Sequence, residues 1–326
     1  MDKKIPLFSL VEPSEMQELV SLLQPVSLEP GQVLFRENTA GDGMWILDEG
    51  AEVSISQTRG KRPVVIANNR GGESVGEMAL IDGGPRSGAA VVTQGGSAQY
   101  ISAANFRALR DAYRPAAFKV MRQLCKELCS RLRVTSDRIA PSQAPTAQPS
   151  QPLTGGRRAT EAEVNAFAPF QSLPKVVKLA LCQKLQSAEI GPNQPICSEG
   201  ERGEHAYFLL SGAVRVTRNG KTLQQLGPGA MFGMVSVIDE GRRSATCIAE
   251  GPAHLLSLSK RDFDNLFLAG NRFAFQMVDL VSRQLVAQLR SANQLVSGLG
   301  STMQERQAQG DALPEMLPLE LEIELS

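Results

Sequence analysis

The sequence predicts a mainly β protein with flanking helices, built from two similar units. Three observations support this fold class. Two long stretches of the chain align with each other. Each stretch contains short, alternating runs rich in β-branched residues between glycine-containing turns, a pattern typical of a small antiparallel barrel or jelly roll. Each unit then ends in a run of residues with helical leucine spacing, which predicts a closing amphipathic helix.

Internal duplication is the most informative of these features. Residues 33–55 align without gaps with residues 195–217. After a hairpin that is five residues shorter in the second copy, the register resumes, so that Arg86 matches Arg243. Two aligned blocks with a single change of offset indicate that one unit was duplicated.

The elements of each unit follow in the same order. Residues 13–24 and 174–186 predict short opening helices, and the strand-like runs come after them. Residues 114–134 and 271–296 predict the closing helices, because their leucines and other apolar residues recur on one face. These apolar stripes are wider than one barrel needs, so we expect the closing helices to mediate contacts between the repeats or between chains.

Composition shifts divide the chain into four segments. Residues 140–160 are rich in Pro, Gln, Ser and Ala and predict a flexible linker, because such a stretch buries too little apolar surface to offset its ordering entropy. The two units then occupy residues 1–139 and 161–297. Residues 298–326 form a tail that begins small and polar.

Charge and hydropathy exclude several classes of protein. The 34 basic and 34 acidic residues cancel, so no electrostatic footprint indicates a nucleic-acid or anionic-membrane partner. No apolar run approaches the length of a membrane span, and the N-terminus lacks the apolar core of a signal peptide. We therefore expect a cytoplasmic protein.

Enzymatic and metal-site signals are absent from the sequence. The five cysteines lack CxxC spacing, and neither of the two histidines has a second metal ligand nearby. No nucleophile-elbow or HExxH motif occurs. The sequence predicts a protein that is not an enzyme and holds neither metal nor cofactor.

The stretch "GEMALIDGGPRS", residues 76–87, contains residue types that suit a nucleotide. The Arg86 guanidinium offers a planar fork of donors for two phosphate oxygens, and Gly76 permits close approach of the backbone. The Glu77 carboxylate only accepts hydrogen bonds, which suits a ribose hydroxyl, and we expect it also to hold Arg86 in place. This combination predicts a ribonucleotide monoester site.

The stretch resembles the phosphate-binding cassette of the cyclic nucleotide-binding domain family. That family includes the regulatory subunits of cAMP-dependent protein kinase and the bacterial catabolite activator protein. The resemblance covers residues 5–138 and 165–296 and implies two double-stranded β-helix jelly rolls. It also implies that Glu77 takes the ribose 2′-hydroxyl and Arg86 the cyclic phosphate. The expected ligand-binding residues are Gly76, Glu77, Met78, Ala79, Arg86 and Ser87.

The second copy departs from the cassette pattern. It keeps Gly233, Arg243 and Ser244 but has Met234 in place of the glutamate. A thioether is a weak acceptor, so a ribose hydroxyl would remain unpaired there at a cost of about 1–3 kcal/mol. We expect a degenerate second site, while a different anionic ligand stays open.

The resulting expectation is a non-catalytic receptor that binds cAMP or cGMP in its first unit and signals to a protein effector through helix rearrangement. The alternative is a protein-interaction scaffold with two inactive nucleotide-binding folds. A transcription regulator is disfavoured, because no helix-turn-helix fits after either closing helix. A homodimer through the closing helices is a further expectation, whereas cAMP, cGMP and cyclic dinucleotides are not distinguished.

Overall fold

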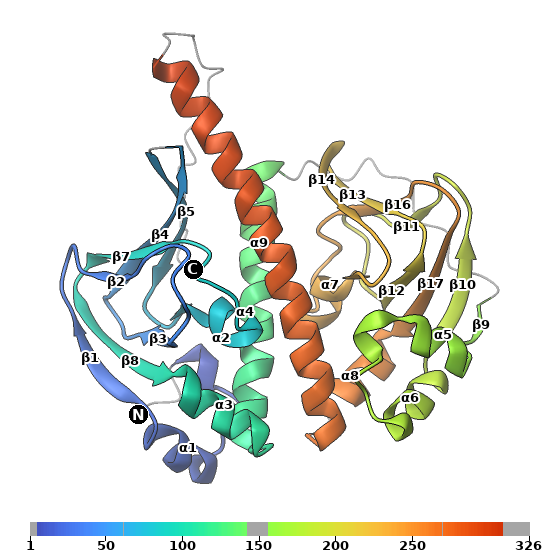
Figure 1. Cartoon of the computed structure of the whole chain (residues 1–326), viewed down its shortest axis with the longest axis horizontal. Coiled ribbons are helices and arrows are strands. Elements are labelled where there is room, and N and C mark those ends of the chain that lie inside the picture. The colour runs from blue at the N-terminus through green and yellow to red at the C-terminus, as the bar shows by residue number, and fades with distance from the viewer. Residues whose placement is uncertain (1–4, 61, 142–155, 269, 309–326) are drawn as a thin grey trace, which may run out of the picture.

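Two β-rich units lie on either side of a pair of long helices (Figure 1). The computed structural model describes residues 5–60, 62–141, 156–268 and 270–308. The helix α4 (Pro115–Ile139) closes the first unit and α9 (Arg272–Ala308) closes the second.

The first unit is a jelly roll of two four-stranded antiparallel sheets, ordered β1-β8-β3-β6 and β2-β7-β4-β5. Apart from the β4–β5 hairpin, neighbouring strands in each sheet are not consecutive in the sequence, so the core between the sheets depends on contacts from along the whole unit. The strands are β1 (Gln24–Leu28), β2 (Val33–Phe35), β3 (Gly43–Leu47), β4 (Glu52–Arg59), β5 (Arg62–Arg70), β6 (Ser74–Val75), β7 (Ala89–Gln94) and β8 (Gly96–Ser102).

The second unit repeats this topology strand for strand. Its sheets are ordered β15-β12-β17-β10-β9 and β11-β16-β13-β14, and β9 is an additional edge strand. The duplication and the predicted jelly-roll class are therefore confirmed. The strands are β9 (Arg157–Arg158), β10 (Gln186–Ile190), β11 (Pro195–Cys197), β12 (His205–Ser211), β13 (Val214–Arg218), β14 (Lys221–Leu226), β15 (Met231–Phe232), β16 (Thr246–Ala249) and β17 (Ala253–Ser259).

Two of the helices begin at residues that suit a helix N-terminus. Thr160 and Glu163 form a capping box at the start of α5, and Pro115 occupies the first turn of α4, where its missing N–H costs nothing. The short helices are η1 (Pro6–Phe8), α1 (Pro13–Val20), α2 (Glu77–Asp82), α3 (Ala103–Asp111), α5 (Glu161–Ala166), η2 (Ala168–Phe170), α6 (Lys175–Cys182), α7 (Met234–Ile238) and α8 (Lys260–Leu268).

The closing helices α4 and α9 pack against each other and join the two units. Their buried apolar faces belong to one continuous core that contains residues of both units. Phe118 of α4 and Phe275 of α9 lie with ring centroids 4.9 Å apart. The leucine stripes of the sequence thus mediate contact between the repeats, which was one of the two expectations for them.

Each closing helix also reaches the cassette helix of the opposite unit. Arg133 of α4 donates two hydrogen bonds to Asp239 at the end of α7, at 2.5 and 2.9 Å. Arg290 of α9 donates two to Asp82 at the end of α2, at 2.8 and 3.2 Å. Arg290 stands 157 positions after Arg133, and Asp239 stands 157 positions after Asp82, so the two contacts are equivalent by the duplication.

Two segment boundaries differ from those predicted. Arg158 and its neighbour form β9 and pair with β10, so the second unit begins before residue 161. Helix α9 continues past residue 297 to Ala308, where the sequence predicted a tail. Most of the predicted linker and residues 309–326 of the tail lie outside the described residues.

Within the four described ranges, no helix combines the length and the hydrophobicity that crossing a membrane requires.

Candidate functional site

The predicted cassette folds as a tight turn followed by α2. Gly76 precedes the helix with a φ of +90°, in the left-handed region that glycine adopts without strain. A Cβ at this position would lie 2.4 Å from Nη1 of Arg86. Glycine is therefore required both for the turn and for the approach of the arginine.

Arg86 is the best-buried charged side chain of the first unit after Glu77, with an exposed fraction of 2%. Its Nη1 donates to the carbonyl of Gly76 at 2.8 Å, and its Nη2 donates to Asp42 and to the carbonyl of Gly43, both at 2.7 Å. The guanidinium lies over the Phe35 ring, 4.2 Å from its centroid. The buried Nε has no hydrogen-bond partner among the described residues. A buried donor without an acceptor is costly, and an anion in the cavity would satisfy it.

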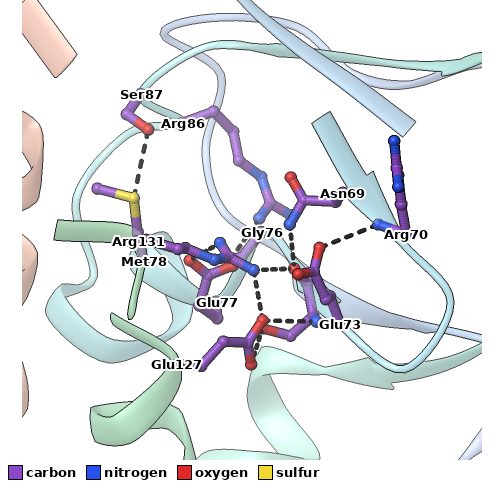
Figure 2. A network of polar contacts seen from close by, with 11 residues as sticks. Asn69, Arg70, Glu73, Gly76, Glu77, Met78, Arg86, Ser87, Glu127 and Arg131 are labelled. Atoms are coloured by element: carbon purple, nitrogen blue, oxygen red, sulfur yellow. Dashed lines mark hydrogen bonds and ion pairs between the residues drawn. The ribbon is translucent and has the colours of Figure 1, made fainter. Parts of the chain in front are cut away.

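Glu77 belongs to a charged network that is centred on Arg131 (Figure 2). Its Oε1 accepts a hydrogen bond of 2.6 Å from Arg131 of α4. Arg131 also donates to Glu127 and to the carbonyl of Ser74, and Glu127 accepts from the amide and the hydroxyl of Ser74 at 2.8 and 3.0 Å. The network anchors α4 to the cassette through one buried and two partly buried charges.

Burial raises the pKa of Glu77 above its ordinary value, because desolvation disfavours the carboxylate. The nearby Arg131 opposes this shift, and Glu127 adds to it. The same carboxylates raise the pKa of Arg131, so this side chain stays charged. The expectation that Glu77 holds Arg86 in place is wrong. Glu77 forms its ion pair with Arg131, and Arg86 forms its ion pair with Asp42.

A cavity of about 420 Å³ opens beside the cassette. Its polar lining includes the Glu77 carboxylate, the Arg86 guanidinium and Ser87. The Ser87 hydroxyl donates to the Met78 sulfur at 3.7 Å, a weak partner that leaves the hydroxyl ready for a better acceptor. All six predicted residues line this cavity: Gly76, Glu77, Met78, Ala79, Arg86 and Ser87.

Two sets of lining residues were not anticipated from the sequence. Arg131 and its neighbours on α4 form one wall, in a helix where no single residue stood out. Leu289 and Asn293 come from α9, so the second unit completes the cavity of the first. Asn293 is 7% exposed, so this polar side chain is buried at the wall of the cavity.

A signal for Arg131 was present in the duplication itself. The residue 157 positions later is Gln288, and the residue at the same interval from Glu77 is Met234. Both charges of the pair are therefore missing together from the second copy. No local pattern indicated Asn293, because it reaches the cavity from the other unit.

The second cassette surrounds a smaller cavity of about 90 Å³. Gly233, Arg243 and Ser244 all line it, as predicted, whereas Met234 is buried in the main hydrophobic core. Arg243 donates to the carbonyls of Gly233 and His205 at 2.6 and 2.7 Å. Within the part of the chain that the structure describes, its buried Nε also has no hydrogen-bond partner. The scaffold of the cassette is kept while its acidic group is lost.

Comparison with known proteins agrees with this geometry. The sequence profile of the cyclic nucleotide-binding domain matches residues 25–113 and 188–269, which together cover just over half of the chain. The chain therefore belongs to the cyclic nucleotide-binding domain family and carries the domain twice in tandem.

Individual relatives include sensors and kinase regulators. The cyclic AMP receptor protein of Thermus thermophilus is 35% identical over 117 residues, which cover 34% of this chain and 54% of that protein. The cAMP-dependent protein kinase regulatory subunit of Yarrowia lipolytica is 28% identical over 144 residues, covering 44% of this chain and 36% of that subunit. The chain thus spans about half of the first relative and about a third of the second.

Longer matches have lower identity. The cAMP-dependent protein kinase regulatory subunit of Dictyostelium discoideum is 20% identical over 269 residues, which cover 80% of this chain and 70% of that subunit. Among solved structures, the regulatory domain of Toxoplasma gondii PKA with cAMP is 17% identical, with a TM-score of 0.32 and coverage of 82% of this chain and 90% of that one.

Proposed function

We propose that the first unit binds a cyclic nucleotide, cAMP or cGMP, and that the chain is a non-catalytic receptor. The observation that carries this proposal is that a buried arginine and a buried glutamate line the same cavity. The Arg86 guanidinium presents an unsatisfied Nε–H, and the Glu77 carboxylate has one oxygen not engaged by Arg131. A phosphate oxygen accepts from a guanidinium N–H, and a neighbouring sugar hydroxyl donates to a carboxylate oxygen.

The base would lie against the closing helices. The cavity extends from the cassette to Thr135 on α4 and to Leu289 and Asn293 on α9. A nucleotide in this position contacts both units at once. Its binding therefore favours one arrangement of the α4–α9 pair, and a protein effector that recognises this pair reads the occupancy of the site.

The test is calorimetry of the intact chain with cAMP, cGMP and cyclic di-GMP. We expect saturable binding of at least one cyclic mononucleotide with a stoichiometry of one. The substitution Arg86→Lys should weaken it tenfold or more, because lysine has no planar fork and lacks an Nε–H.

The matched control is Arg243→Lys in the second cassette. It removes the same carbonyl contacts from the scaffold but should change the nucleotide affinity less than twofold. Failure of all three nucleotides to bind would favour the alternative, a protein-interaction scaffold with two inactive nucleotide-binding folds. A stoichiometry of two, with equal losses in both variants, would overturn the asymmetry of the proposal.

A further inference from the structure

Two cysteines face each other in the wall of the second cavity. Cys197 on β11 and Cys247 on β16 are direct partners in the antiparallel register of these strands. Both are free thiols, buried with exposed fractions of 2% and 5%. Their counterparts in the first unit are Phe35 and Ala90, so the dithiol belongs to the second unit alone.

The strand register provides the separation that a disulfide needs. Directly opposed residues in an antiparallel pair have Cα atoms about 4.5–5.5 Å apart, and disulfides span Cα distances of about 4.4–6.8 Å. The two thiols are close enough for each to shift the pKa of the other. The register between β11 and β16 shifts between Pro195 and Cys197, and Cys197 remains directly opposite Cys247 beyond this irregularity.

The surroundings activate one thiol of the pair. The hydrogen bond from Cys247 lowers the pKa of Cys197 below its ordinary value, and the nearby Arg243 guanidinium acts in the same direction against the effect of burial. The pKa of Cys247 is raised well above its ordinary value, chiefly by the same hydrogen bond and by burial. We therefore expect Cys197 to be the attacking thiol and Cys247 to be the resolving thiol.

An oxidant has room to reach the pair. Both cysteines and Arg243 line the cavity of about 90 Å³. A water-sized particle needs about 10–15 Å³ of such volume, so several fit, and a small peroxide fits as well.

We propose that Cys197 and Cys247 form a reversible disulfide in the second cassette, with hydrogen peroxide as the oxidant. The Cys197 thiolate attacks a peroxide oxygen, the O–O bond breaks, and hydroxide leaves and is protonated to water. Cys247 then transfers its proton to the departing oxygen and attacks the sulfenic sulfur, so that the S–S bond forms and the S–O bond breaks. Two thiols lose two electrons in total, and one peroxide becomes two waters.

A second pair of cysteines in the chain provides an internal comparison. Cys125 and Cys129 are one turn apart on α4 and fully buried. Residues at this helical spacing have Cβ atoms about 5–6 Å apart, whereas a disulfide needs about 3.5–4.5 Å. Burial raises the pKa of both thiols. This pair should stay reduced under conditions that oxidise the pair in the second cassette.

The test is peroxide treatment of the reduced intact chain, followed by alkylation under denaturing conditions and tryptic peptide mass analysis. We expect residues 185–202 linked to residues 244–260 with the loss of two hydrogens, and dithiothreitol should reverse the link. Cys197→Ser and Cys247→Ser should each reduce this product to background. Cys182→Ser, a matched change outside the cavity, should leave its yield unchanged.

A second readout identifies the attacking thiol. In Cys247→Ser, the sulfenic acid of Cys197 has no resolving partner, so dimedone should label residue 197. In Cys197→Ser, residue 247 should remain unlabelled. Peroxide treatment that leaves both thiols alkylated, links either to another cysteine, or drives Cys197 to the sulfinic acid without a link would overturn the proposal.

Discussion

The two cassettes share their backbone but differ in a network of three charged side chains. In the first unit these side chains contact one another beneath the cavity and tie α4 to the turn before α2. In the second unit all three positions are neutral. The replacements are Glu77 by Met234, Glu127 by Gln284 and Arg131 by Gln288.

The loss of all three charges together has a physical reason. Removing one member of a buried charged network leaves another charge without compensation, which destabilises the fold by several kcal/mol. The scaffold contact survives the exchange, since Gln288 donates to the carbonyl of Met231 just as Arg131 donates to that of Ser74. The second unit thus retains the helix anchor and loses the acidic acceptor.

The arginine is kept twice because it has a structural role in both units. Arg86 donates to the carbonyls of Gly76 and Gly43, and Arg243 donates to the carbonyls at the equivalent positions, Gly233 and His205. These bonds fasten the cassette turn to the sheet whether or not a ligand is present. The retained arginine alone is therefore weak evidence for nucleotide binding. The glutamate, which only the first unit has, is the feature that distinguishes the two cassettes.

The largest expected effect comes from placing the neutral network of the second unit in the first. Glu77→Met with Arg131→Gln removes a charge-assisted acceptor for the ribose, worth about 1.5–3 kcal/mol. Nucleotide affinity measured by calorimetry should fall about tenfold to a hundredfold.

Unfolding in urea then tests whether the two charges act as a pair. Glu77→Met alone leaves Arg131 with one carboxylate fewer, so the double variant should be less destabilised than the sum of the single variants by about 1 kcal/mol or more. Additive destabilisation would show that the network is not coupled. An unchanged affinity would remove Glu77 from the site.

The parts of the site that could be predicted are those set by a contiguous motif or by the duplication, and the rest depends on how the helices pack. The jelly-roll class and the six cassette residues could be predicted, because the duplication and one contiguous motif encode them. No local motif identifies the partner of Glu77, because the contact depends on how α4 is rotated against the cassette, and only the joint loss of both charges from the second copy points to Arg131. The leucine stripe of α9 predicted a contact but not its target, which includes the cavity of the other unit.

This crossing of the helices also limits what a fragment can show. Residues 1–140 would expose the face of α4 that packs on α9 and would lack Leu289 and Asn293. The two cassettes are therefore better compared within the intact chain, by substitutions at equivalent positions.

An intermediate effect is expected at Asn293. Its buried amide lines the first cavity from the second unit, and a hydrogen bond to the base is worth about 0.5–1.5 kcal/mol. Asn293→Ala should weaken nucleotide binding about twofold to tenfold. The equivalent position on α4 is Ser136, and Ser136→Ala should leave the affinity unchanged. Equal effects of both changes would indicate a general loosening of the helix pair and would argue against a contact with the base.

The smallest expected effect concerns the equivalent ion pairs between the units. Arg290→Gln and Arg133→Gln each break a bidentate contact to the aspartate at the end of a cassette helix. The side chains are 19–27% exposed, so each loss should lower the free energy of unfolding by about 0.5–1 kcal/mol.

Stability therefore does not distinguish the two variants, but nucleotide affinity should. Arg290 holds Asp82, and α2 between Asp82 and Glu77 lines the proposed binding site, so Arg290→Gln should weaken binding about twofold. Arg133 holds the cassette that lacks the glutamate, and its loss should leave binding unchanged. If both variants bound equally well, the contact of α9 with α2 would be a structural fastening that has no influence on the nucleotide.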